Sequence, residues 1–173
     1  MTLSLAWQLP AQQFKFNLEH LESKAADSVD ISLNGSTLQF AAKFLDSKDP
    51  DEAQVKKLIA GLEGIYVKTF SFKSEGVWAP ADLERVRTQL RAPEWSRIIG
   101  IRSAEDGETA EVYVRSDSKD SKKVSGVAIL MSAPKELTVV NIAGAVDLDS
   151  LASLSGHFGL PKLESTPQAH PRK

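Results

Sequence analysis

The chain has 173 residues, no cysteine and a formal net charge of −2. This length suits one domain that can bury a sizeable core. The absence of cysteine excludes disulfides, thiol catalysis and cysteine-ligated zinc. The slightly acidic balance argues against a general nucleic-acid binder, which usually shows a basic footprint.

The first eleven residues form a short apolar run that ends with Pro10 and Ala11. This pattern resembles the downstream half of a secretory signal, without its positively charged start. We therefore interpret residues 1–13 as the remnant of a signal peptide, which predicts an exported protein of the periplasm or cell envelope. The alternative is a true start at Met1, a cytoplasmic protein and an apolar N-terminus that packs on the domain. No run approaches the roughly 20 apolar residues of a membrane-spanning helix.

The region before residue 35 predicts one helix and one strand. Strict alternation of apolar and polar residues over 29–33 predicts a brief strand. Apolar residues at helical spacing predict a helical N-terminal extension over 17–26. The residues that carry this spacing are Leu18, Leu21 and Ala25.

Two further helix starts follow. Ser36 and Gln39 fit a capping box, in which both side chains bind otherwise unpaired amides at the helix start. Asp49 followed by Pro50 is a stronger signal, because aspartate caps a helix and proline suits its first position. The helix after Asp49 carries a core-facing stripe at i, i+3, i+4 and i+7 spacing, formed by Val55, Leu58, Ile59 and Leu62.

From residue 65 onward, strand-like runs alternate with short turns. We expect one helix over 82–90 and a further short helix from 147 to 156. Asp106-Gly107 fits a hairpin turn, because both residues tolerate a positive φ. The expected strands are 65–72, 95–102, 110–115, 124–131 and 137–143, of which the first and the last have the composition of interior strands.

These elements predict an α+β fold. We expect an antiparallel sheet of about five strands with helices packed on one face, plus the helical N-terminal extension. The single domain is expected over residues 14–160. Residues 161–173 have little apolar content and are expected to form a disordered tail.

No cluster of reactive side chains stands out. His20, His157 and His170 lack the helix or turn spacing of metal ligands. A triad of Ser155, His157 and Asp147 can be drawn, but its members lie on one short helix and turn, which does not suit triad geometry. We therefore expect no catalytic, cofactor-binding or metal site.

Arginine and aromatic residues offer a different kind of candidate. Five arginines near Trp95 could form an anion-binding or RNA-contacting surface, but acidic residues are interleaved among them. Glu84 can pair with Arg87 along a helix, which favours a solvated helix face. The arginines are Arg85, Arg87, Arg91, Arg97 and Arg102.

Three aromatic residues are candidate partner contacts: Tyr66, Trp78 and Trp95. Aromatic side chains are enriched at the energetic centres of interfaces. For Trp78, the alternative is a ring folded over the edge of the sheet.

Four segments, taken in order, form a recognisable set. They are GLEGIYVKTFSF (61–72), QLRAPEWSR (89–97), ELTVVNIAG (136–144) and LSGHFGLP (154–161). Together they resemble a bacterial family known as a domain of unknown function, numbered forty-two fifty-two, over about residues 14–161. Members of that family are small exported proteins, some with a lipoprotein signal, which implies export here. The resemblance implies no lipid anchor, because the chain lacks a lipobox cysteine, and no site, because the family has no established activity.

We therefore expect a non-catalytic binding or interaction module of the cell envelope. Its partner would be a protein or peptide, with no nucleic acid and no cofactor. Two alternatives remain open. One is a small-ligand enzyme or hydrolase with a site of scattered Asp, Glu, Ser and Arg residues, and the other is a self-associating structural protein.

Overall fold

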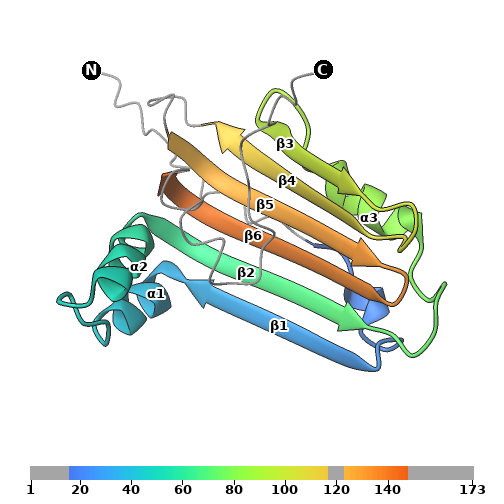
Figure 1. The fold of residues 1–173 in the computed structure, drawn as a ribbon, viewed down its shortest axis with the longest axis horizontal. Coiled ribbons are helices and arrows are strands. Elements are labelled where there is room, and N and C mark those ends of the chain that lie inside the picture. Colours follow the sequence, from blue (N-terminus) through green and yellow to red (C-terminus); the bar gives the residue numbers. More distant parts are fainter. Residues whose placement is uncertain (1–15, 117–122, 148–173) are drawn as a thin grey trace, which may run out of the picture.

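The computed structural model describes residues 16–116 and 123–147, and these form an α+β fold (Figure 1). Six antiparallel strands make one sheet in the order β1-β2-β6-β5-β4-β3, so β1 and β3 are its two edges. The strands are β1 (Asp27–Asn34), β2 (Leu62–Ser71), β3 (Trp95–Arg102), β4 (Thr109–Ser116), β5 (Lys123–Ala133) and β6 (Glu136–Asp147). The helical elements are the 3-10 turn η1 (Glu19–Leu21), α1 (Gly35–Ala42), α2 (Pro50–Ala60) and α3 (Pro80–Arg87).

The α+β class and the antiparallel sheet are confirmed, with six strands where about five were expected. The prediction of 29–33 as a brief strand was too short, because β1 pairs along its whole length with β2. The prediction of interior positions for 65–72 and 137–143 is confirmed, since β2 and β6 each have a strand on both sides.

The predicted helix over 17–26 is wrong. The chain makes only the single turn η1, and it enters that turn through Asn17 with a positive φ of 52°. Leu18 and Leu21 are fully buried within this one turn. Their spacing satisfies a short turn as well as a helix, and the chain must extend from Asp27 onward to pair with β2.

The two faces of the sheet are covered by different helices, whereas we expected helices on one face only. On the first face, which we call the α3 face, Phe70, Leu130 and Leu137 pack with Leu83 and Val86 of α3. Leu18, which precedes η1, and Leu21, its last residue, belong to the same cluster. The opposite face, which we call the α1 face, forms a second apolar cluster that includes residues of α1 and α2. Figure 1 shows α1 and α2 together at one end of the sheet, beside the tip of β1.

The start of α1 differs from its prediction. Asn34 caps the helix, because its side-chain oxygen accepts a hydrogen bond from the Thr37 amide at 2.9 Å. Ser36 lies inside the first turn instead of capping it. Gln39 donates to the Ile59 carbonyl at 3.2 Å, so this side chain ties α1 to α2 and does not complete a capping box.

The start of α2 follows its prediction. The Asp49 carboxylate accepts hydrogen bonds from the amides of Asp51 and Glu52, at 2.9 and 3.2 Å. Pro50 occupies the first helical turn, where a missing amide costs nothing. The cap therefore fixes where the chain enters the helix that packs on the α1 face.

Strand β6 runs to Asp147, beyond its predicted end at 143. Gly144 permits this extension, because its φ is 119° and a Cβ there would lie 2.5 Å from the Gly61 carbonyl oxygen. The helix predicted over 147–156 lies outside the described residues apart from Asp147 itself. The predicted signal remnant (1–13) and the predicted tail (161–173) lie wholly outside them.

Candidate functional site

A cleft of about 680 Å³ opens on the α3 face, between α3 and the β3 edge. It exists because α3 packs over the interior strands, while no residue of β3 is buried. Thr109, Glu111 and Ser132 lie on the sheet at its floor. The other lining residues are Trp78, Pro80, Leu83, Glu84 and Arg87 on the α3 side, and Arg97, Gly100, Ile101, Arg102, Ser103, Ala104 and Gly107 on the β3 side.

A second hollow of about 310 Å³ lies close by. It shares Thr109 and Ser132 with the cleft, and its charged lining residues are the carboxylates Glu108 and Glu136. We take the larger cleft as the candidate site, because buried and exposed charges converge there in one bonded network.

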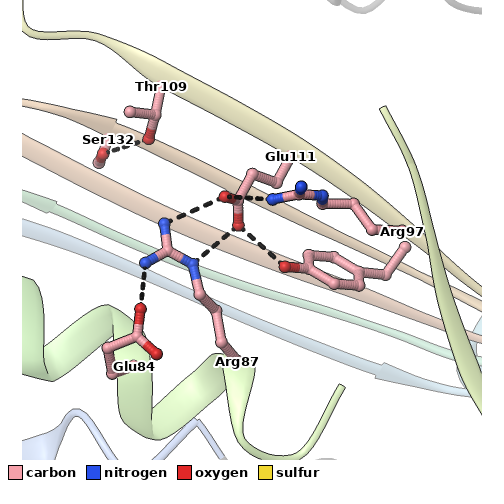
Figure 2. A network of polar contacts seen from close by, with 7 residues as sticks. Glu84, Arg87, Arg97, Thr109, Glu111 and Ser132 are labelled. Atoms are coloured by element: carbon pink, nitrogen blue, oxygen red, sulfur yellow. Dashed lines mark hydrogen bonds and ion pairs between the residues drawn. The ribbon is translucent and has the colours of Figure 1, made fainter. Parts of the chain in front are cut away.

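Glu111 is the buried charge in the floor of the cleft, with 10% of its side chain exposed. One oxygen accepts from Arg87 Nη2 at 3.1 Å and from Arg97 Nη1 at 3.4 Å. The other accepts from Arg87 Nε at 2.9 Å and from the Tyr113 hydroxyl at 3.0 Å. A carboxylate offers about four acceptor positions, so Glu111 is fully paired. Figure 2 shows the two arginines reaching Glu111 from different sides.

Arg87 connects α3 to the sheet through this carboxylate. It also donates to Glu84, one turn earlier on α3 (Figure 2). Burial alone would lower the pKa of Arg87, but its hydrogen bonds to Glu111 and Glu84 raise that pKa above its usual value. Burial and the negative charge of Glu111 raise the pKa of Tyr113, so its hydroxyl stays protonated as a donor at neutral pH.

Arg97 and Arg102 supply exposed positive charge at the β3 side of the cleft. The Arg97 side chain is 56% exposed and lies over Gly100, where a Cβ would be 3.6 Å from the guanidinium carbon. Arg102 is exposed and has no ion-pair partner among the residues that the structure describes. The lining holds three arginines and two glutamates, a net charge of +1, whereas the whole chain carries −2. Arginine binds carboxylate and phosphate groups through paired hydrogen bonds, so this cleft suits an anionic ligand.

Residues 21–154 match the family described as "Domain of unknown function (DUF4252)", which is well over half of the chain. The chain belongs to the DUF4252 family. No curated protein and no solved structure gives a significant match. The resemblance found in the sequence is thereby confirmed, and the function of the cleft has to be argued from its own residues.

The structure brings one of the three predicted partner contacts of this DUF4252 chain to the cleft. Trp78 lines it, half-buried, and its indole Nε1 donates to the Ala133 carbonyl at 3.0 Å. Trp95 packs against the core and covers Gly126, where a Cβ would meet the indole at 3.3 Å. Tyr66 is half-buried on β2, and neither it nor Trp95 lines the cleft. A role of these two in partner binding stays a prediction.

Sequence reasoning missed Glu111. The predicted pair of Glu84 and Arg87 is confirmed, but the same arginine also reaches a strand 24 residues further along the chain. The signal that could have revealed Glu111 is the alternation of side chains along β4, which puts Glu111 on the same face as Tyr113. A carboxylate on a face that a helix covers needs a buried donor, and an arginine of that helix is the obvious source.

A second polar contact joins α3 to η1. His20 Nε2 lies 2.9 Å from an oxygen of Asp82, whose other oxygen accepts from the Ala79 amide at 2.9 Å. Burial would raise the pKa of Asp82, but the hydrogen bonds from Ala79 and His20 outweigh it and lower the pKa. His20 therefore links two covering elements of the α3 face, although its position in the sequence indicated no partner.

Within 16–116 and 123–147, no group of three or more His, Asp or Glu side chains is placed to hold a metal ion. In the same residues, no helix is long and apolar enough to cross a membrane.

Proposed function

We propose that this DUF4252 protein is a non-catalytic binding module, and that its cleft takes a peptide or protein segment that presents an acidic group beside an apolar one. The observation that carries the proposal is the pair of exposed arginines, Arg97 and Arg102, on the same side of one cleft. Both project from β3, on either side of Gly100.

The Glu111 network supports the proposal because it orders Arg97 before any ligand arrives. Immobilising a long arginine side chain costs up to about 2 kcal/mol of rotamer entropy. Part of that entropy is already lost in the free protein, because Glu111 holds one end of the Arg97 guanidinium. The guanidinium has five N–H donors in all, so others are left for a carboxylate in the cleft.

The opposite wall supports the apolar half of the proposed ligand. Trp78, Pro80 and Leu83 line the cleft on the α3 side. The hydrogen bond from Trp78 to Ala133 fixes the indole, so its ring offers a rigid surface to an incoming side chain. The cleft therefore combines a charged side with an apolar side.

The test is fluorescence anisotropy with three labelled peptides that differ only in charge: acidic-apolar, neutral-apolar and basic-apolar. We expect the acidic peptide to bind and its affinity to fall with added salt. The double variant Arg97→Glu, Arg102→Glu should lose at least about tenfold in affinity, because each charge-assisted contact contributes roughly 1.5–3 kcal/mol. Arg91→Glu is the matched control, since Arg91 is exposed but lies outside the cleft lining.

Two results would contradict the proposal. One is preferential binding of the neutral or basic peptide. The other is equal affinity of the acidic peptide for the unaltered chain and for the double variant.

The proposed location is the cell envelope. Its support is the apolar run within residues 1–13 and the exported character that the family resemblance implies. Fractionation of cells that produce the native reading frame tests this part of the proposal. Recovery in the cytosolic fraction alone would contradict it.

A further inference from the structure

The outer edge of β1 is long and regular. All eight residues of β1 pair with β2 without a register shift, and no strand of the described residues lies on its other side. An edge of this kind presents a row of unpaired amide and carbonyl groups, which is a template for another strand. None of the eight side chains is buried.

Exposed apolar side chains gather at this same edge. In the described part of the chain, the exposed large hydrophobic residues are Val29, Ile31, Phe40, Phe44, Ile98 and Ile101. The first four come from β1 and from α1 with its following turn, and Figure 1 shows α1 beside the tip of β1. Phe40 and Phe44 contact each other edge to face, with ring centroids 5.2 Å apart and exposed fractions of 61% and 75%.

Of the two registers in which β1 overlaps a copy of itself most fully, the sequence favours one. In an antiparallel pair related by a twofold axis perpendicular to the sheet, one residue lies opposite its own copy. Centring the pair on Ile31 places Val29 opposite Leu33 and Asp30 opposite Ser32. Centring it on Asp30 would instead oppose two carboxylates and place Asp27 opposite Leu33, which is unfavourable.

We infer that two copies of this chain associate through their β1 edges, antiparallel and centred on Ile31, to form a twofold dimer with one continuous sheet. The pairing satisfies the edge amides and carbonyls of both copies and covers the exposed Val29 and Ile31 side chains. It leaves β3 and the cleft free, so it is independent of the proposed ligand.

Sedimentation of the full chain over a range of concentrations is the first test. We expect a closed monomer–dimer equilibrium that Ile31→Lys weakens by at least about tenfold, because two lysines would face each other at the axis. Ile98→Lys is the matched control, since Ile98 is 51% exposed on the other edge strand, and it should leave the equilibrium unchanged. A monomer at every concentration would overturn the inference, as would an open series of larger species, which indicates pairing of β1 with β3.

Single-cysteine crosslinking tests the register. The chain has no cysteine, so Ile31→Cys carries the only thiol. In the inferred dimer its two copies are about 4.5–5.5 Å apart at Cα, within the range of a disulfide. We expect oxidation to crosslink Ile31→Cys rapidly and to leave Asp30→Cys and Ile98→Cys largely monomeric. Faster crosslinking of either control, or none at Ile31→Cys in a folded chain, would overturn the inferred pairing.

Discussion

The two edges of the sheet are built differently. β3 contains a register irregularity between Arg97 and Ile99, and its arginines project toward the cleft. β1 is regular along its length, and its charged residues are Asp27 and Asp30. Bulges and positive charges discourage strand addition, whereas a regular edge invites it. One sheet can therefore present a side-chain site at one edge and a regular backbone at the other.

The buried charges next to the two edges also differ, in how far their ion-pair partners are exposed to water. Glu111, next to β3, is paired with Arg87, whose side chain is only 25% exposed. Lys68, next to β1, pairs with Glu22 and Asp30, which are 49% and 63% exposed. Removing Arg87 leaves a buried carboxylate, whereas removing Lys68 leaves carboxylates that reach water, so the loss of the cation should cost more on the β3 side.

The largest expected effect is that of Arg87→Met. It leaves the Glu111 carboxylate buried without its bidentate partner, which should lower the free energy of unfolding by about 3 kcal/mol. Chemical denaturation followed by circular dichroism measures this loss. Arg91→Met, at an exposed position, should change the value by less than about 0.5 kcal/mol.

A double variant separates the lost ion pair from lost packing. Arg87→Met with Glu111→Leu removes both charges, so we expect it to recover most of the stability that Arg87→Met loses. If the double variant is less stable than Arg87→Met, the unpaired Glu111 carboxylate is not the cause of the stability that Arg87→Met loses, which would contradict the account of this pair.

Asp82→Asn should have an intermediate effect, since Asp82 joins α3 to η1 through His20. The asparagine cannot accept two charge-assisted hydrogen bonds, and we expect a loss of about 1–2 kcal/mol at neutral pH. The pKa of Asp82 is lowered in the folded state, so its contribution is present above the unfolded pKa of about 3.9 and is lost as pH falls through the lower folded pKa.

Urea titrations of the unaltered chain and of Asp82→Asn between pH 7 and pH 2 measure this dependence. The difference between the two unfolding free energies should be present at neutral pH, should shrink below pH 4 and should then vanish. A difference that grows as pH falls below 4 would contradict the assigned role of Asp82.

Lys68→Met should have the smallest effect, within about 1 kcal/mol, because its acidic partners stay solvated when the ammonium group is removed. Burial would lower the pKa of Lys68, but its hydrogen bonds to Glu22 and Asp30 raise it. Any contribution of this pairing is therefore complete at neutral pH and is lost only as pH rises through the raised pKa. A loss as large as that of Arg87→Met, measured by the same denaturation, would remove the contrast between the two edges.

Much of the fold could be predicted because its signals are local. Asp49-Pro50 specifies the start of α2 by chemistry that involves only the next few residues. The predicted strand over 95–102 coincides with β3, since alternation and β-branched residues need no distant partner to be recognised. The wrong prediction of a helix over 17–26 shows that the spacing of apolar residues cannot distinguish a helix from a single turn. Leu18 and Leu21 are fully buried around one 3-10 turn.

The candidate site could not be predicted in the same way. Its central contact joins Arg87 on a helix to Glu111 on a strand, and this pairing depends on which face of the sheet α3 covers. Composition showed a cluster of arginines but not which of them meet a buried carboxylate. Trp78 was predicted as a contact because aromatic residues are enriched at interfaces, and it does line the cleft. The same reasoning selected Tyr66 and Trp95, which lie outside the cleft, so residue type alone does not identify the site.

Hydrogen exchange of the backbone amides at several protein concentrations tests the difference between the edges most directly. We predict that amides of β1 become more protected as concentration rises, while those of β3 do not change. The same pattern should disappear in Ile31→Lys. Equal protection of both edges at every concentration, or a concentration dependence confined to β3, would contradict the account.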